Sequence, residues 1–176
     1  LVMPMKILIR GAILSTTLIC LIACNSKNES IGKCVFHYNE SNGITSLDPA
    51  FSRDIEVMWA THQLFDGLVE LNDSMRVIPC IAKSWEISED GKMYTFHLRD
   101  SVYFHPSPLF ADSTHRKVVA SDFVYTFNRL LDKSLASPAV WIFKYVDFVD
   151  HPGFEAVNDS TLHIYLTQPF QPFLGI

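Results

Sequence analysis

The chain has 176 residues, of which 48% are hydrophobic and 12% aromatic, and its 14 basic and 19 acidic side chains give a net charge of −5. This composition is typical of a folded protein, because a chain of this length can bury roughly two-thirds of the surface that its unfolded form exposes. The acidic balance argues against a nucleic-acid-binding protein, which needs positive charge to meet the phosphate backbone.

The first 23 residues have the pattern of a secretory signal peptide. Lys6 and Arg10 precede an uncharged stretch from Gly11 to Ala23, which is too short to span a bilayer comfortably. The stretch ends in Leu-Ile-Ala-Cys, which resembles the lipobox of bacterial lipoproteins, so we expect cleavage before Cys24 and lipidation of that residue. The alternative is a buried cysteine at the end of a core helix.

Removal of residues 1–23 takes away two basic residues and no acidic one, so the net charge changes from −5 to −7. The polar residues 24–33 that follow are typical of a flexible tether. No other stretch reaches membrane-spanning length. We therefore expect a protein of the cell envelope, held by lipid on the extracytoplasmic side of a membrane, either periplasmic or at the cell surface.

Two cysteines remain once Cys20 is assigned to the leader and Cys24 to the anchor. Cys34 and Cys80 would lie in a compartment where disulfides can form. Their spacing is not diagnostic, so a disulfide between them stays open, and mass spectrometry without reduction would decide it.

Beyond the tether, short extended segments are interleaved with helices. Apolar side chains at helical spacing predict a helix that is capped at Ser52 or Asp54 and runs to about Phe65. The loop before it, residues 43–51, is broken by Pro49. Short strands are predicted at 34–38, 68–71 and 77–79.

Residues 84–100 have the pattern of a complete β-hairpin. Apolar and polar residues alternate on both sides of the reversal, which is the two-residue period of a half-buried strand. Asp90-Gly91 suits the tight turn, because Gly tolerates a positive φ and Asp can bond to its own backbone. A third strand at 102–104 is predicted to continue the hairpin. The apolar face of the return strand consists of Tyr94, Phe96 and Leu98.

A loop rich in proline and polar residues, 105–118, separates the hairpin from an amphipathic helix that begins near Ser121. Ser137-Pro138 interrupts the chain after this helix. A second hairpin is predicted from two strands, 154–157 and 161–166, around the turn Asn158-Asp159. Strict alternation of strand and helix is absent, which indicates a mixed α+β architecture. The apolar stripe of the helix consists of Phe123, Phe127, Leu130 and Leu131.

The sequence contains no motif for catalysis or metal binding. None of the seven histidines shares a helix face with another at i, i+4 spacing, and neither H-E-x-x-H nor C-x-x-C occurs. A G-x-S-x-G elbow and a Walker phosphate loop are also absent. The scattered carboxylates leave open a catalytic pair that only the fold would assemble. The residues themselves therefore predict no enzyme, no metal site and no cofactor.

Short motifs in a fixed order resemble those of one family. They are S-L-D-P at 46–49, L-F-D-G-L-V-E-L at 64–71, P-x-I-A-x-S-W at 79–85, D-G-K-x-Y-T-F-H-L-R-D at 90–100, V-x-F-H at 102–105, D-F-V-Y-T-F-N-R-L at 122–130, S-P at 137–138 and D-S-T-L-x-I-x-L at 159–166. Together they are similar to the N-terminal part of the family 5 extracellular solute-binding proteins, which are the oligopeptide, dipeptide and nickel receptors of ABC importers. The similarity runs from about Val35 to Ile176.

The resemblance implies an α/β fold of the periplasmic-binding-protein-like class II, with two lobes that close on a ligand by a hinge motion. Residues 34–65 would start lobe I, and residues 66–176 would form a small extra domain beside it, incomplete at its C-terminus. The chain begins with Leu and ends within a pattern, so we expect it to be a mixed α+β part of a longer polypeptide, without the second lobe. The hairpin at 84–100 would be scaffold beside the cleft.

The resemblance also implies a function and ligand contacts. The expected function is that of a substrate-binding lipoprotein, without cofactor or catalysis, which captures peptides and delivers them to the permease of an importer. Alternatives are a nickel or heme receptor of the same family, a surface hydrolase, and a structural module that binds another protein. Other roles remain open for two of the contact residues, a helix cap for Asp54 and a core aromatic for Trp141. The expected contacts are Ser52, Arg53, Asp54, Ala139, Val140 and Trp141.

The sequence departs from the family pattern before the long helix. His105-Pro106-Ser107-Pro108 stands where the family has H-D-G-x-P, and a longer loop follows. Val119 replaces the threonine that commonly caps the helix, so Ser121 is expected to cap it one turn later.

Overall fold

The computed structural model describes residues 37, 39–110 and 115–175. The chain divides into two units, Leu1–Asn39 and Glu40–Ile176, and the fold described below is that of the second. The predicted signal peptide, Cys24, the tether and, apart from His37, the strand at 34–38 lie outside the described residues. Within the part of the chain that the structure describes, no helix has the length and apolar character needed to cross a membrane.

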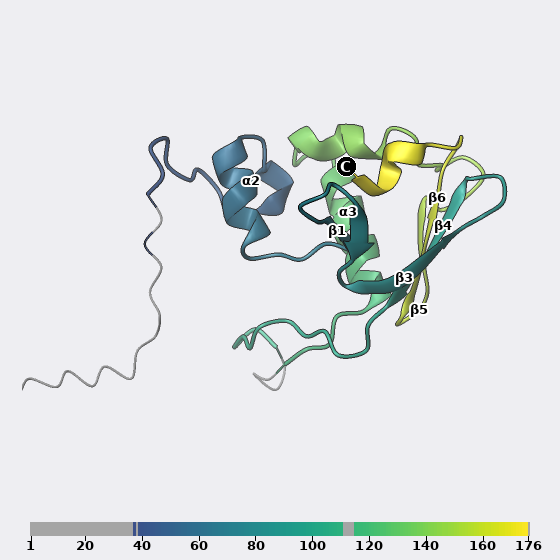
Figure 1. Ribbon diagram of the computed structural model, residues 1–176, viewed down its shortest axis with the longest axis horizontal. Coiled ribbons are helices and arrows are strands. Elements are labelled where there is room, and N and C mark those ends of the chain that lie inside the picture. The colour runs from purple at the N-terminus through teal and green to yellow at the C-terminus, as the bar shows by residue number, and fades with distance from the viewer. Residues whose placement is uncertain (1–36, 38, 111–114, 176) are drawn as a thin grey trace, which may run out of the picture. The chain divides into compact units, whose positions relative to one another are not determined.

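Four antiparallel strands of residues 40–176 form one sheet (Figure 1), with the strand order β3-β4-β6-β5. Each predicted hairpin supplies two neighbouring strands, and β4 pairs with β6 so that Phe96 lies opposite Leu162. Both hairpins are therefore confirmed, and the structure joins them into one sheet. The strands are β3 (Ala82–Ile87), β4 (Met93–Leu98), β5 (Phe154–Asn158) and β6 (Thr161–Tyr165).

One face of the sheet carries the core. Buried and half-buried residues alternate along β4 and β6, as the two-residue period requires. Burial of each large side chain contributes about 1.5–3 kcal/mol to folding, so this face stabilises the unit. Five of its side chains are at most 2% exposed, namely Tyr94, Phe96, Leu98, Leu162 and Ile164.

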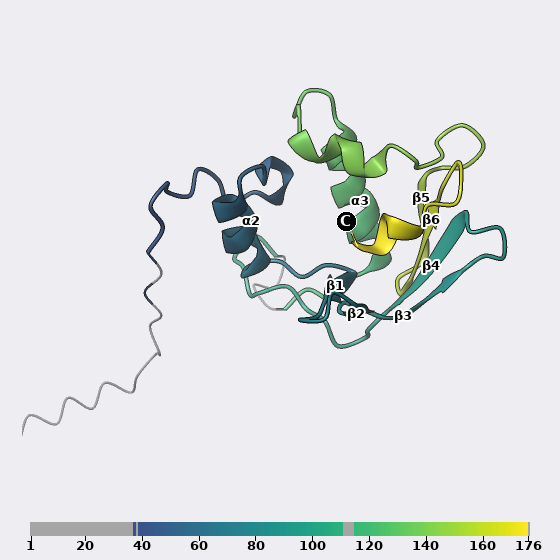
Figure 2. The same ribbon diagram turned by 45° about the horizontal axis from the view of Figure 1, so that its top comes forward.

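The long helix α3 (Ala120–Leu131) packs against the core side of the sheet and contacts β5 and β6 (Figure 2). The ring of Phe127 lies 5.0 Å from that of Phe154 and 5.3 Å from that of Phe143, between centroids. Phe143 ends the 3-10 helix η2 (Pro138–Phe143). An aromatic cluster thus joins helix, sheet and η2.

The start of α3 differs from the prediction that Ser121 caps it. The N-cap residue is Val119, and the carboxylate of Asp122 accepts a hydrogen bond from its backbone N–H at 2.9 Å. The backbone N–H of Ala120 donates to the carbonyl of Asp159 at 2.9 Å. The first N–H group of the helix, that of Ala120, and the N–H group of the N-cap residue therefore both have acceptors without a hydroxyl cap, and Ser121 lies inside the helix.

The predicted third strand at 102–104 is also wrong. Tyr103 forms only an isolated antiparallel bridge with Lys117. The prolines at 106 and 108 follow directly, and since proline cannot donate a backbone hydrogen bond, the pairing is not extended into a ladder.

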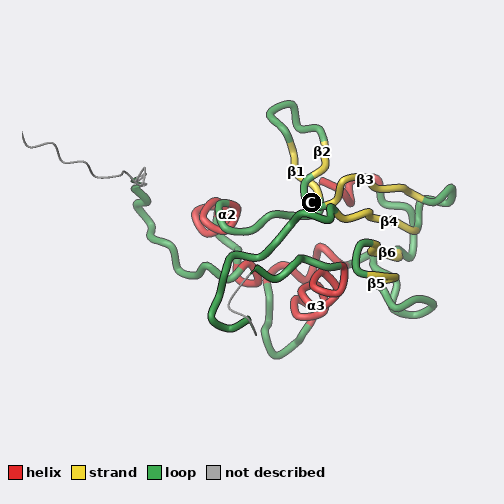
Figure 3. The backbone as a smooth tube through the Cα atoms, turned by 90° about the horizontal axis from the view of Figure 1, so that it is seen from below, coloured by secondary structure: helices red, strands yellow, loops and turns green. Residues whose placement is uncertain are grey.

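The short strands predicted at 68–71 and 77–79 form as β1 (Val69–Leu71) and β2 (Val77–Pro79), and the structure pairs them in a second, two-stranded sheet, which Figure 3 shows beside β3 and β4. Its turn is held by Asn72, whose side-chain oxygen accepts from the backbone N–H groups of Ser74 and Arg76, both at 3.0 Å.

The helix predicted to reach Phe65 is shorter in the structure. It is α2 (Ile55–His62), and the backbone N–H groups of Leu64 and Phe65 both donate to the carbonyl of Thr61 in a closing turn. Asp54 occupies the N-cap position, but its side chain makes no capping hydrogen bond.

Candidate ligand-contact site

The two segments expected to contact a ligand are brought together by two short 3-10 helices. The helix η1 (Pro49–Phe51) packs against η2, although the two are far apart in sequence. Ser137 donates its hydroxyl hydrogen to the carbonyl of Ala50 at 2.7 Å. Ser137 is 6% exposed and Ala50 is 1% exposed, so this bond lies in the interior of the contact.

An ion pair ties the same region to α3. The guanidinium of Arg129 donates two hydrogen bonds to the carboxylate of Asp48, at 3.0 Å and 2.6 Å. Asp48 also caps η1 by accepting from the backbone N–H of Ala50 at 3.0 Å. The hydrogen bond from Arg129 lowers the pKa of Asp48, with a smaller opposing effect of burial, so the carboxylate is ionised at neutral pH.

The expected contact residues after η1 differ in their surroundings. Ser52 is half-buried and its hydroxyl lies 3.1 Å from that of Thr61 on α2, so it is engaged within the fold. Arg53 and Asp54 are exposed. Because the Asp54 carboxylate does not cap α2, the charges of both residues are accessible to a ligand.

The expected contact residues in η2 follow Ser137. The backbone N–H of Ala139 donates to the Ser137 hydroxyl oxygen at 3.2 Å. Val140 is 42% exposed and Trp141 is 64% exposed. Trp141 is therefore not the core aromatic of the alternative interpretation, and its indole offers an apolar surface with one N–H donor.

The two segments thus present charged groups and an indole near one contact between η1 and η2. Guanidinium and carboxylate groups can bind the charged ends of a zwitterionic ligand, and an indole can pack on an apolar side chain. The arrangement is suited to recognition through hydrogen bonds, charge and apolar contact.

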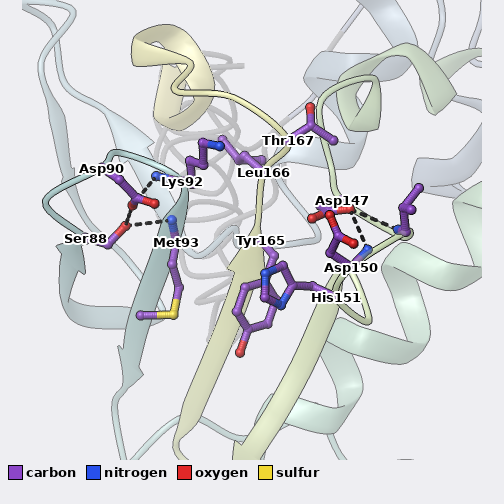
Figure 4. A pocket seen from close by; sticks show the side chains of 11 residues that line it. Ser88, Asp90, Lys92, Met93, Asp147, Asp150, His151, Tyr165, Leu166 and Thr167 are labelled. Carbon is purple, nitrogen blue, oxygen red and sulfur yellow. Dashed lines mark hydrogen bonds between the residues drawn. The ribbon is translucent and has the colours of Figure 1, made fainter.

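A hollow that the sequence did not predict lies between the β3–β4 turn and the loop before β5 (Figure 4). Its volume is about 640 Å³. The ring of His151 stacks on that of Tyr165, with centroids 4.5 Å apart and planes at 9°. The lining residues come from 88–93, 147–151 and 165–167, so the hollow is on elements other than η1 and η2.

Asp147 holds the loop beside this hollow. Its carboxylate accepts hydrogen bonds from the backbone N–H groups of Val149, at 2.9 Å, and Asp150, at 3.2 Å, and these bonds lower the pKa of Asp147. An Asp side chain that binds backbone N–H groups two and three residues ahead is a local turn signal. The signal in the sequence is Asp147 itself, because the partners at 149 and 150 contribute only backbone N–H groups.

The described residues contain no group of three or more His, Cys, Asp or Glu side chains arranged to hold a metal ion. Cys80 forms no disulfide with any residue that the structure describes, and Cys34 lies outside those residues. Burial raises the pKa of the Cys80 thiol, which disfavours the nucleophilic thiolate.

Comparison with known proteins identifies the family. The family model described as bacterial extracellular solute-binding proteins, family 5 Middle, matches residues 76–176, which is more than half of the chain. The chain belongs to this family. The family resemblance inferred from the sequence motifs is therefore confirmed.

Among the family 5 relatives, the periplasmic murein peptide-binding protein MppA of Escherichia coli is 32% identical over 143 residues, which cover 74% of this chain and 25% of MppA. The dipeptide-binding protein of the same organism is 36% identical over 121 residues, or 64% of this chain and 22% of the relative. The chain thus spans about a quarter of the length of these proteins.

Solved structures give the same assignment. The periplasmic binding protein DppA of Helicobacter pylori, in complex with the peptide STSA, matches 74% of this chain and 27% of its own, with a TM-score of 0.61 and 33% identity. NikZ of Campylobacter jejuni, in complex with Ni(L-His), matches 76% of this chain and 24% of its own, with a TM-score of 0.59 and 29% identity. The predicted fold class is confirmed, and the chain is a mixed helix-and-sheet part of that larger fold.

Proposed function

We propose that this chain is part of the substrate-binding component of an ABC importer, which captures oligo- or dipeptides outside the cytoplasmic membrane and delivers them to the permease. The observation that carries this proposal is the contact between η1 and η2: the exposed Arg53 and Asp54 follow η1, and the exposed Trp141 lies in η2. The peptide-binding names of several family relatives support the choice of ligand.

In the proposed mechanism, the side chains of this region bind and orient a peptide without breaking a bond. Arg53 and Asp54 offer opposite charges to the peptide ends or side chains, and Trp141 packs on an apolar group. Closure of two lobes around the ligand would exclude water and strengthen these contacts. Residues 34–65 would belong to lobe I and residues 66–176 to the extra domain.

The N-terminal lipobox supports a lipid anchor at Cys24, after cleavage of residues 1–23 and followed by the tether. The protein would then remain on the extracytoplasmic side of a membrane, close to the permease. Incorporation of radiolabelled fatty acid tests the anchor, because a Cys24→Ala variant must lose the label, and equal labelling of both proteins contradicts the anchor.

Peptide binding is tested on the full-length gene product. Short peptides are expected to raise the melting temperature, since a ligand at 100 times its Kd stabilises the native state by about 2.7 kcal/mol. A Trp141→Ala variant should bind more weakly, whereas Tyr103→Ala, which removes another exposed aromatic side chain, should bind as the unmodified protein does. Equal effects of the two substitutions would contradict the role of Trp141.

A nickel complex or heme is the second candidate ligand, because relatives named for these ligands occur in the family, such as NikZ and the heme-binding protein A of Haemophilus influenzae. The same melting experiment includes heme and nickel with histidine as separate additions. A shift with one of these and with no peptide would replace the peptide in the proposal.

A further inference from the structure

One hydroxyl group links η2 to η1, the short helix that precedes the first candidate contact segment. The Ser137 hydroxyl donates to the carbonyl of Ala50 and accepts from the backbone N–H of Ala139. Ala50 is two residues before Ser52, and Ala139 is itself a candidate contact. Two segments separated by 87 residues in sequence are therefore joined through one buried side chain.

The Asp48–Arg129 pair holds the same region from the side of α3. A guanidinium that donates two parallel bonds to a carboxylate fixes both distance and orientation, which a lysine could not do. The same carboxylate caps η1. Because Asp48 is the N-cap of η1, movement of η1 relative to α3 would break both hydrogen bonds from Arg129, although 81 residues separate the two partners in sequence.

The Asp48–Arg129 ion pair fixes the position of η1 relative to α3 more than it adds to the free energy of unfolding. The side chains of Arg129 and Asp48 are 37% and 32% exposed, and ion pairs that solvent reaches contribute little to the free energy of unfolding. The residues that follow the pair, Arg53 and Asp54, are exposed and are not held by bonds of their own to η2. The position of these charges relative to η2 therefore depends on how η1 is held.

We propose that Asp48, Arg129 and Ser137 are positioning residues for ligand binding, which hold segments 52–54 and 139–141 at a fixed spacing before the ligand arrives. This inference rests on the proposed function. A prearranged site lowers the conformational entropy lost on binding. Loss of the link should then weaken ligand affinity although none of the three side chains needs to touch the ligand.

The test uses the full-length gene product with the variants Arg129→Met and Ser137→Ala. The matched control is Arg116→Met, because Arg116 pairs with Asp122 at the opposite end of the same helix. Isothermal titration calorimetry with short peptides measures affinity, thermal unfolding measures stability, and amide hydrogen exchange without ligand measures opening of segments 48–61 and 137–143.

For Arg129→Met we expect roughly tenfold weaker peptide binding, which corresponds to about 1.4 kcal/mol, and faster exchange in both segments. Arg129→Lys, which keeps the charge but not the planar fork, should have intermediate affinity. Ser137→Ala should accelerate exchange in both segments as well. Arg116→Met should change neither the affinity nor the exchange of these segments.

Two results would overturn the inference. One is an unchanged exchange rate in segment 137–143 when Arg129 or Ser137 is replaced. The other is a loss of affinity that Arg116→Met reproduces, or that follows only the change in melting temperature. If the unmodified protein binds no peptide, the proposed function fails, whereas faster exchange of both segments in Arg129→Met still supports the link.

Discussion

Phe154 is the side chain on which the contact between sheet, α3 and η2 should depend most. It is 3% exposed, and its ring lies 5.0 Å from Phe127, 5.1 Å from Phe143 and 5.5 Å from Phe148, between centroids. A Phe154→Leu substitution keeps most of the apolar area but removes three aromatic pairs. Each pair contributes about 0.5–1.5 kcal/mol beyond its buried area.

Because neighbouring contacts are not additive, we expect Phe154→Leu to lower the free energy of unfolding by about 2 kcal/mol, out of the roughly 5–15 kcal/mol of a typical domain. Urea unfolding followed by circular dichroism measures this as a lower midpoint at an unchanged slope. The control is Phe65→Leu, since Phe65 is 52% exposed and should change stability by less than about 0.5 kcal/mol. Equal losses in the two variants would refute the aromatic cluster.

Two further substitutions test local geometry and charge. Gly153 and Gly43 have similar positive φ angles, 76° and 74°, but a Cβ at Gly153 would lie 2.1 Å from the Phe148 ring, whereas a Cβ at Gly43 would have nothing within 4 Å. Both alanine variants carry the strain of the left-handed backbone, and only Gly153→Ala adds a clash, so it should lower the free energy of unfolding by at least about 1 kcal/mol more than Gly43→Ala. Equal urea midpoints for the two variants would contradict this. The hydrogen bond to Glu155 raises the pKa of Tyr165 to about 12 from an ordinary 10.0. The protonated Tyr165 therefore stabilises the folded protein fully below pH 10, and this contribution to the free energy of unfolding should be lost as the pH rises toward 12. In an ultraviolet absorbance titration, Glu155→Gln should move this late ionisation to lower pH, and an unchanged curve would contradict the assignment.

The two hairpins of the sheet were predictable because the residues that specify their strands and turns are close together in the sequence. Alternation at Tyr94, Phe96 and Leu98 indicates a strand with one buried face, and the Asp90-Gly91 turn specifies the reversal. Gly91 indeed has a φ of 70°. The pairing of β4 with β6, by contrast, joins hairpins that are far apart in sequence, and no local pattern specifies that register.

The errors at the ends of elements have a common cause. Ser121 is the expected N-cap of α3 because serine is a preferred capping residue. In the structure the N-cap is Val119, and its backbone N–H donates to the carboxylate of Asp122, three residues later in the helix. An acidic side chain at this third position is a known helix-start signal, so the sequence contained the information. The prolines at 106 and 108 are likewise a signal in the sequence, because they cannot donate the backbone hydrogen bonds that would extend the pairing of Tyr103 into a strand.

The candidate site was predictable only in part. Segments 52–54 and 139–141 came from the family resemblance, and the structure places η1 and η2 in contact. The Asp48–Arg129 pair could not be inferred from the sequence, because each residue also suits an exposed surface position. Whether the two segments touch a ligand stays a prediction.

We propose that the full-length protein binds peptides and leaves them intact. Calorimetric titration of the full-length gene product with defined di- and oligopeptides, followed by mass spectrometry of the recovered ligand, tests it most directly. We predict saturable binding and recovery of unmodified peptide. Binding of no peptide by folded protein, or peptide cleaved during the titration, would contradict the claim.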